Sequence, residues 1–167
     1  KISYANSIGD LAIKAGANPD KILEALGADS RIGSKNLKYG FGYGGPCFPR
    51  DNKALLHYSN KINAFTPLNE AADKINNFHS DFLFNHFINN NDISTKVIFD
   101  GIGDEKNKSD DNKKIFEGVA YKKGTTILDD SQQLNFAVKL AEYGYKVEIN
   151  EIAEILSQLK EKYSNLF

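Results

Sequence analysis

The stretch INNNDISTKVIFDGIG, residues 88–103, marks the place where the sequence pattern changes. INNNDIS consists mostly of turn formers, whereas KVIFDGIG is a short β-type run. Apolar residues keep helical spacing before this stretch, and further β-type runs follow it. We therefore predict an α/β fold, with an all-helical central region over residues 1–92 and a small, abbreviated Rossmann-like α/β domain over residues 93–167.

The region before residue 88 is predicted to be helical almost throughout. Asn18 is a good capping residue, and Pro19 suits the first turn of a helix. Apolar residues at helical spacing define segments that run from Ile2 to Gly16, from Pro19 to Gly27, from Pro49 onward and from Pro67 onward.

The region after residue 92 alternates β-type and helical patterns. The runs KKIFEGVAY and YKVEIN flank a helical segment that ends at Gly144, and this order predicts parallel strands with a right-handed crossover. A final helix is predicted after Glu151. The charged segment DEKNKSDDNK, residues 104–113, lacks apolar residues and is predicted to be a solvated loop.

Composition excludes several classes of protein. The chain has 167 residues, of which 41% are apolar, so it can bury a core. A net charge of −1 provides no positive field that would attract nucleic acid, so no nucleic-acid partner is expected. No apolar run is long enough to span a bilayer, so no membrane partner is expected. A single cysteine excludes an internal disulfide, so we expect a cytoplasmic protein. Because the sequence begins with Lys1 and lacks methionine, we also expect a piece of a longer chain.

The segment KYGFGYGGPCFPRD, residues 38–51, has glycine at positions 40, 42, 44 and 45. Glycine-rich loops let backbone N–H groups approach phosphate oxygens, but they also occur where the chain simply turns sharply. The spacing matches neither a Walker loop nor a dinucleotide fingerprint, because no strand precedes it and no GK[ST] follows. Anion binding and a structural turn therefore stay open as alternatives.

The chain's only cysteine lies in this segment. A free cysteine is often a buried apolar residue, but the glycines and proline before Cys47 offer little cover. Arg50 and a helix start at Pro49 both favour a thiolate. Asp51 is placed to orient water or handle protons, although an acid in a first helical turn is also ordinary capping. We predict that Cys47 is a nucleophile and that Asp51 assists it.

The three histidines are widely spaced in predicted helices. His57, His79 and His86 have no cysteine or HExxH pattern near them. Structural or surface roles are therefore predicted for all three, and no metal site is expected.

Residues 40–51, GFGYGGPCFPRD, resemble the active-site loop of the UDP-glucose/GDP-mannose dehydrogenase family, whose members carry variants of G-F-G-G-x-C-F-P-[KR]-D. GADSRIG, residues 27–33, is similar to the family's R-I-G region, and ISYANSIGDLA, residues 2–12, to the end of its central helix. GVAYKKGTT, residues 118–126, is similar to the first strand of its C-terminal domain. The resemblance covers nearly the whole chain in the family's order.

This resemblance implies an NAD-dependent enzyme that oxidises the C6 hydroxyl of UDP-glucose to a carboxylate in two hydride transfers. Cys47 matches the nucleophile that forms a thiohemiacetal and then a thioester, and Asp51 matches the acid that assists proton transfer and water activation. The resemblance places cofactor contacts at Phe48, Pro49 and Arg50. It places substrate contacts at Arg31, Lys38, Tyr39, Gly40, Phe41, Gly42, Tyr43, Gly44, Tyr121 and Lys122.

The resemblance also implies partners that the chain does not contain. Arg31 corresponds to an arginine that reaches the substrate of a neighbouring subunit, so a homodimer through the central helices is expected. The family's NAD-binding Rossmann domain and the catalytic lysine and asparagine of its central helix would lie before Lys1. The chain alone is therefore expected not to catalyse hydride transfer.

The C-terminal half departs from the family pattern. In TTILDDSQQ, residues 125–133, Asp129 stands where the family has arginine, and the chain ends about one helix after KVEIN. These departures leave a non-catalytic module for dimerisation or nucleotide-sugar binding as an alternative. GDP-mannose or another UDP-sugar is an alternative substrate, and a helical interaction protein with a structural glycine loop is an unrelated alternative. A place in polysaccharide biosynthesis is what the resemblance suggests.

Overall fold

A computed structural model describes residues 1–103, 112–164 and 166–167 of the chain. The chain forms two compact units: unit 1 contains residues 1–43 and 47–83, and unit 2 contains residues 44–46 and 84–167. The division by function near residue 92 stays a prediction. Of the charged segment 104–113, all but its last two residues lie outside the described part of the chain.

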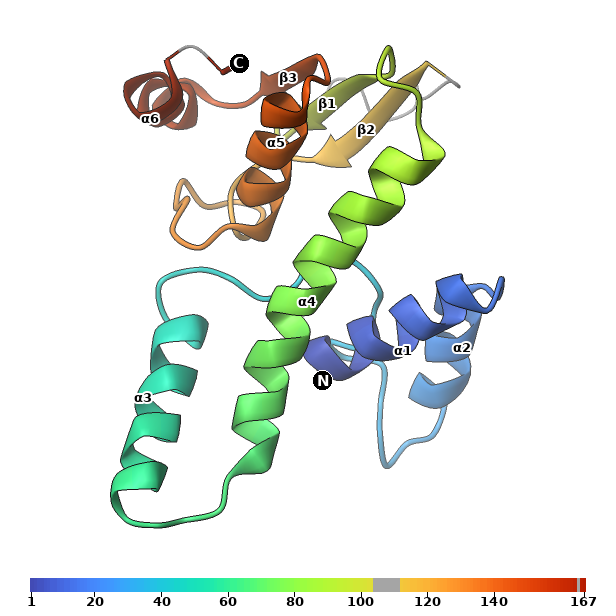
Figure 1. The fold of residues 1–167 in the computed structure, drawn as a ribbon, viewed down its shortest axis with the longest axis vertical. Coiled ribbons are helices and arrows are strands. Elements are labelled where there is room, and N and C mark those ends of the chain that lie inside the picture. The colour runs from blue at the N-terminus through green and yellow to red at the C-terminus, as the bar shows by residue number, and fades with distance from the viewer. Residues whose placement is uncertain (104–111, 165) are drawn as a thin grey trace. The chain divides into compact units, whose positions relative to one another are not determined.

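Unit 1 is helical, as the sequence predicts (Figure 1). Asn18 caps the second helix, because its side-chain oxygen accepts a hydrogen bond from the backbone N–H of Lys21 at 3.1 Å. Pro49 lies in the first turn of the third helix, where its missing N–H costs no hydrogen bond. The helices are α1 (Ile2–Lys14), α2 (Pro19–Gly27), α3 (Phe48–Lys61) and the first part of α4 (Pro67–Asn90), whose end belongs to unit 2.

The core of unit 1 ties the glycine-rich segment to the first two helices. Ala5 of α1, Leu23 of α2 and Leu37 of the following loop are buried together. The partly buried side chains packed on them are Ile8, Leu26 and Tyr39. Burial of Leu37 and Tyr39 therefore anchors the start of the glycine-rich segment by the hydrophobic effect.

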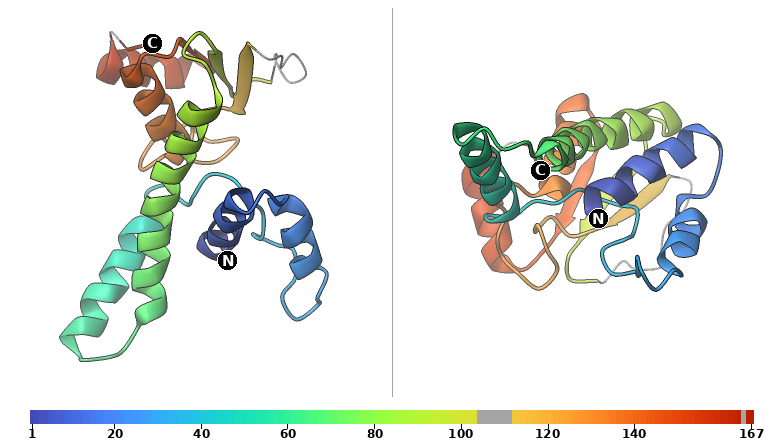
Figure 2. Two further views of the ribbon diagram at one scale, coloured as in Figure 1. Left: turned by 45° about the vertical axis from the view of Figure 1, so that its right-hand side comes forward. Right: turned by 90° about the horizontal axis from the view of Figure 1, so that it is seen from below.

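Unit 2 is an α/β unit whose small sheet is entirely parallel (Figure 2). Its strands are β1 (Lys96–Asp100), β2 (Lys113–Glu117) and β3 (Val147–Asn150), and its other helices are α5 (Gln132–Tyr143) and α6 (Ala153–Tyr163). The predicted α/β class with parallel strands is confirmed. The strands that α5 connects are not neighbours, however, because β1 lies between β2 and β3. Val97, Ile98 and Phe99 are buried along β1, which suits the central position of a parallel sheet.

The strands β1 and β2 carry nearly the same sequence. The sequences are Ile98-Phe99-Asp100-Gly101 and Ile115-Phe116-Glu117-Gly118. Their first three residues pair in register, so that Phe99 lies beside Phe116. The two rings stack with centroids 5.3 Å apart, and Phe136 of α5 packs edge-on against both. Equivalent residues thus meet across the strand pair, and α5 is held against one face of the sheet.

Two further findings concern the described residues as a whole. Among them, no helix combines the length and the apolar character that a bilayer span requires. Within the same residues, no three side chains of His, Cys, Asp or Glu converge as metal ligands would.

Candidate active site

Cys47 lies at the N-cap of α3 and is exposed. The backbone carbonyl of Cys47 accepts a hydrogen bond from the N–H of Asp51 at 2.8 Å, which begins the helix. Pro49 is buried in the first turn and fixes the direction of the helix. The thiol is therefore presented to solvent at a helix start, where backbone N–H groups and the helix dipole favour negative charge.

The charged neighbours of Cys47 form an exposed ion pair. Arg50 donates from Nε to Oδ1 of Asp51 at 2.9 Å, and both side chains are largely exposed. The hydrogen bond that Arg50 donates to Asp51 raises the pKa of Arg50, and the electrostatic effects of Asp51 and Cys47 act in the same direction. Phe48 is also exposed, and Tyr43 meets its ring edge-on with centroids 6.3 Å apart. Phe48, Tyr43 and Asp51 line an open groove in unit 1.

The first part of the glycine-rich segment, residues 39–43, is held inside unit 1. The ring of Tyr39 lies against Gly9 so closely that a Cβ there would be 1.9 Å from a ring carbon. The hydroxyl of Tyr39 donates to Asp10 at 2.8 Å. At Gly42 a Cβ would be 2.3 Å from Oδ1 of Asn76. Glycine at positions 9 and 42 therefore allows a neighbouring side chain to pack directly against the backbone, and flexibility is not its role here.

Backbone groups of the same segment bond to buried side chains. The N–H of Gly40 donates to Oδ1 of Asn6 at 3.2 Å, and its carbonyl accepts from Nε2 of His79 at 2.7 Å. The N–H and carbonyl of Tyr43 bond to the amide of Asn76, each at 2.9 Å. Phe41 and Gly42 lie between these two anchored residues and are half-buried.

Residues 44–46 of the glycine-rich segment belong to unit 2. The N–H of Gly45 donates to the carbonyl of Asp129 at 3.0 Å, and a Cβ on Gly44 would be 2.1 Å from the carbonyl oxygen of Asp130. Gly45 has a φ of +83°, and a Cβ there would lie 2.5 Å from the ring of Tyr121. Unit 2 thus places Tyr121 against Gly45, the residue after Gly44, and Gly44 and Tyr121 are both predicted substrate contacts.

The remaining predicted contacts are basic side chains on the surface. Arg31 is largely exposed, and its guanidinium is held by both carboxylate oxygens of Asp29. Hydrogen bonds to Arg31 lower the pKa of Asp29. Lys38 in unit 1 and Lys122 in unit 2 are also exposed. These three cations are available to an anionic ligand, and Arg31 is the one whose direction is fixed.

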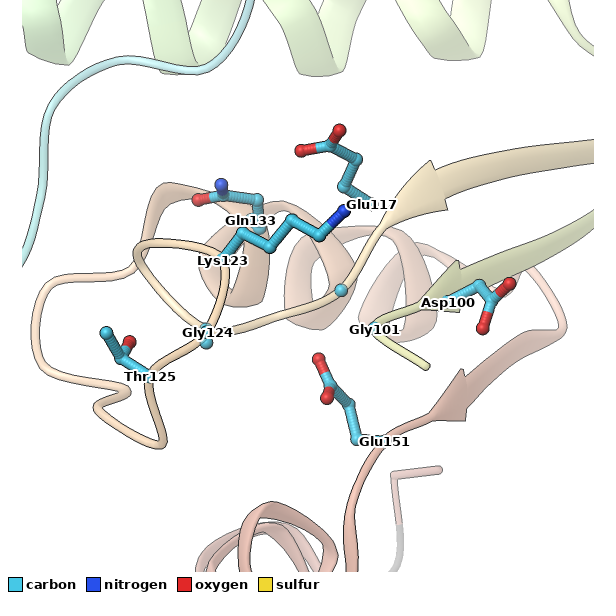
Figure 3. Close-up of a pocket in the computed structure, with 10 residues that line it drawn as sticks. Asp100, Gly101, Glu117, Lys123, Gly124, Thr125, Gln133 and Glu151 are labelled. Atoms are coloured by element: carbon cyan, nitrogen blue, oxygen red, sulfur yellow. The ribbon is translucent and has the colours of Figure 1, made fainter. Parts of the chain in front are cut away.

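A small pocket opens in unit 2 at the carboxyl ends of the strands (Figure 3). Asp100 ends β1, Glu117 ends β2, and Glu151 follows β3. Oε1 of Glu151 accepts a hydrogen bond from the N–H of Val119 at 2.9 Å, and its carboxylate fills the space beside Gly101. The predicted site residues are not among the residues that line this pocket. Glu151 thus links the end of β3 to the segment that follows β2.

The structure adds three residues that sequence reasoning missed, and it shows the hydrogen-bond partners of His79, for which a structural or surface role is predicted. Asn6, Asp10 and Asn76 are buried and polar, and His79 is fully buried. Asn6 and Asp10 lie one turn apart on the face of α1 that also carries Ala5 and Gly9, so both interrupt an otherwise small or apolar stripe. A buried polar residue requires a partner, and polar residues within an apolar stripe were the signal that could have found them.

The comparisons with known proteins agree on one family. Residues 1–78 match the UDP-glucose/GDP-mannose dehydrogenase family, central domain. The chain is 37% identical over 89 residues to the UDP-glucose 6-dehydrogenase YwqF of Bacillus subtilis, covering 53% of this chain and 20% of that protein. It is 31% identical over 147 residues to a UDP-glucose 6-dehydrogenase of Rhizobium meliloti, covering 88% of this chain and 30% of that protein.

A solved structure shows that the fold is shared. A UDP-glucose dehydrogenase from the hyperthermophilic archaeon Pyrobaculum islandicum superimposes with a TM-score of 0.72 at 22% identity, covering 98% of this chain and 34% of that one. The helical unit and the small parallel sheet thus share the fold of about a third of that protein. The chain belongs to the UDP-glucose/GDP-mannose dehydrogenase family. It spans about a fifth to a third of the length of these relatives.

Proposed function

We propose that this chain supplies the nucleophile and much of the substrate site of a nucleotide-sugar dehydrogenase that converts UDP-glucose to UDP-glucuronate with NAD. The observation that carries the proposal is the exposed Cys47 at the start of α3, directly after the glycine-rich segment. An exposed thiol at a helix start favours a nucleophile over a buried structural cysteine. Two relatives named as UDP-glucose 6-dehydrogenases favour UDP-glucose over GDP-mannose.

Cys47 provides the covalent chemistry in this proposal. Its thiolate attacks the C6 aldehyde, a C–S bond forms, and the former carbonyl oxygen takes up a proton to give a thiohemiacetal. When bound, NAD would supply the hydride acceptor for the two oxidations at C6. Loss of the second hydride and of the hydroxyl proton leaves a thioester on Cys47. Water then attacks the thioester carbon, the C–S bond breaks, and the thiolate is regenerated.

Asp51 is proposed to handle the proton of the attacking water. It lies one helical turn after Cys47, and its carboxylate already accepts one hydrogen bond from Arg50. A carboxylate has free lone pairs beyond that bond, so it can also accept a proton or orient water.

The residues proposed for the cofactor fit NAD unequally. Phe48 offers an exposed aromatic face and Arg50 an exposed cation, which suit the ring and the pyrophosphate of a dinucleotide. Pro49 is buried, so its part is to set the start of α3. We propose that most NAD contacts come from an NAD-binding domain outside this chain.

We propose that residues from each unit contact the substrate. In unit 1, Lys38 and residues 39–43 are proposed to contact the nucleotide sugar, and in unit 2, Gly44, Tyr121 and Lys122. Arg31 would serve the site of a second subunit in a homodimer formed by the central helices. We also propose residues 1–92 and 93–167 as the functional domains, a cytoplasmic location, and a role in polysaccharide biosynthesis.

The single cysteine makes a direct test possible. UDP-glucose is expected to slow alkylation of Cys47 by iodoacetamide in this chain, whereas an equal concentration of GDP-mannose is expected to have little effect. The complete gene product is expected to reduce NAD with UDP-glucose, and Cys47→Ser to abolish steady turnover. The 167-residue chain without further domains is expected to produce no NADH.

The two arms of this test separate the alternatives. If UDP-glucose protects Cys47 but the complete gene product shows no turnover, a non-catalytic binding module is favoured. The reason to consider this alternative is Asp129, an acidic residue where the family has arginine. An alkylation rate insensitive to both nucleotide sugars, together with no turnover, would contradict the proposal.

A further inference from the structure

The segment from Gly40 to Tyr43 is held by side chains rather than by secondary structure. It belongs to no helix or strand, yet the N–H and the carbonyl of both end residues are hydrogen-bonded to side chains. Asn76 reproduces the paired bonds of a neighbouring β-strand, because its Oδ1 accepts from the N–H of Tyr43 and its Nδ2 donates to the Tyr43 carbonyl. We call Asn6, Asn76 and His79 the loop clamp.

Each member of the loop clamp is buried, so its hydrogen bonds fix a conformation. Asn6 is 1% exposed, Asn76 is 5% exposed and His79 is fully buried. Asn6 comes from α1, whereas Asn76 and His79 lie one turn apart on α4. Buried polar groups lose much stability when they are left unpaired, so the segment has few alternative conformations that satisfy them.

Asp10 orients the histidine of the clamp. A carbonyl oxygen can only accept, so the bond between His79 and Gly40 places a hydrogen on Nε2. Nδ1 of His79 lies 2.8 and 2.9 Å from the two oxygens of Asp10, one of which also accepts from the Tyr39 hydroxyl. A hydrogen must lie between Nδ1 and Asp10 as well. The pair therefore holds one shared proton and no net charge, which suits its buried position.

The geometry points to a role in positioning the substrate. We propose that the loop clamp, with Asp10 orienting His79, preorganises the backbone of Gly40–Tyr43 to receive the nucleotide sugar. This inference rests on the proposed function. A segment that is already ordered loses less conformational entropy when ligand binds, so the clamp lowers the cost of binding. These side chains touch the loop rather than the reacting atoms, and they are positioning residues.

The first test replaces the ring that bonds Gly40. His79→Phe keeps an aromatic ring of similar size but removes both nitrogens, whereas His79→Gln keeps a donor for the carbonyl. We expect His79→Phe to speed amide hydrogen exchange across residues 40–43 by about fivefold to tenfold, as the loss of its one hydrogen bond to this segment predicts. We expect His79→Gln to restore most of the protection. His57→Phe, at an exposed histidine of α3, is the matched control.

The same variants separate binding from chemistry. The concentration of UDP-glucose that half-protects Cys47 from iodoacetamide should rise about fivefold to tenfold in His79→Phe. The alkylation rate without ligand should stay unchanged, because α3 rather than the clamp places the thiol. In the complete gene product, the same change should appear in KM more than in kcat.

A second pair of variants covers the case in which His79→Phe does not fold. Asn76→Asp keeps the acceptor for the Tyr43 N–H but turns the donor into an oxygen that faces the Tyr43 carbonyl. Asn77→Asp introduces the same charge at the adjacent, exposed position. Only Asn76→Asp is expected to speed exchange at residues 40–43 and to weaken protection by UDP-glucose.

Hydrogen exchange without ligand tests the clamp itself, and protection by UDP-glucose tests its role in binding. If hydrogen exchange at residues 40–43 is unchanged in a folded His79→Phe or Asn76→Asp variant, the claim that the loop clamp holds this segment is wrong. Faster exchange with unchanged protection by UDP-glucose would overturn its role in binding. If the wild-type chain shows no protection by any nucleotide sugar, the proposed function fails, whereas the exchange experiment still decides whether the clamp holds the loop.

Discussion

Individual residues explain why the glycine-rich segment has its composition. Gly9 and Gly42 leave room for the Tyr39 ring and for the Asn76 amide, and Gly45 supplies a left-handed turn beside Tyr121. The sequence identified this segment and its thiol, because glycine, proline and cysteine are distinctive in a local pattern. It gave little sign of Asn76 or of its bonds to Tyr43, because those residues are 33 positions apart.

The two tyrosines of this segment give a prediction at the same scale. Burial raises the pKa of Tyr39, and the hydrogen bond to Asp10 adds to this effect. The pKa of Tyr43 is also raised, by burial first and then by its hydrogen bond to Asp73. Because an unfolded chain loses tyrosine protons near pH 10 while these two stay protonated in the folded state, the free energy of unfolding should fall as pH rises above about 10.

Urea denaturation at pH values from 8 to about 11 measures this effect. Tyr39→Phe and Tyr43→Phe should each make the decline less steep, because each removes one group that titrates differently in the two states. Tyr4→Phe changes an exposed tyrosine of α1 and serves as the control. A decline equally steep in all of these proteins would contradict the assignment.

Helices and strands were more predictable than single contacts. The N-cap at Asn18, the prolines at helix starts and the apolar periodicity located the helices of unit 1, because these signals act within a few residues. The β-type runs located the strands. Strand order was not predicted, because a strand–helix–strand pattern does not say whether the two strands are neighbours. In the structure the buried strand β1 lies between β2 and β3.

The central position of β1 leads to a prediction about its phenylalanine. Phe99 is fully buried and packs on both Phe116 and Phe136, whereas Phe116 lies on the edge strand β2 and is half-buried. Phe99→Ala should lower the free energy of unfolding by ~3–5 kcal/mol, because it leaves a cavity at the centre of the core. Phe116→Ala, at the paired position, should cost roughly half as much.

Chemical denaturation followed by circular dichroism compares the two variants. Equal losses would indicate that the two strands contribute equally to the core. A larger loss for Phe116→Ala would contradict the central position of β1.

At the scale of the whole molecule, the proposed homodimer makes a prediction about Arg31. If Arg31 contributes to the site of the neighbouring subunit, Arg31→Ala removes a ligand contact from the partner subunit's site. Cys47→Ser removes the thiol from the site of the subunit that carries the substitution. A mixed dimer would therefore keep one complete site, in which Cys47 from one subunit meets Arg31 from the other. UDP-glucose should protect that Cys47 from iodoacetamide.

Mixing and re-equilibrating the two variants tests this expectation. Protection by UDP-glucose should be weak in Arg31→Ala alone and should return for part of the thiol after mixing with Cys47→Ser. Sedimentation measurements report whether dimers form. If dimers form but protection by UDP-glucose does not return, the proposal that Arg31 contributes to the site of the neighbouring subunit is wrong. Asp29→Asn, which weakens the hold on Arg31, is expected to have an intermediate effect.

The sequence by itself determined the fold class, the helices, the strands and the position of the thiol, because each follows from short-range patterns of apolar, glycine and capping residues. The tertiary structure decided the order of the strands and the partners of the glycine-rich segment. Asp10 and His79 are 69 residues apart, and only the packing of α4 against α1 and the loop joins them. Hydrogen bonds between distant residues depend on the whole path of the chain, so no local pattern specifies them.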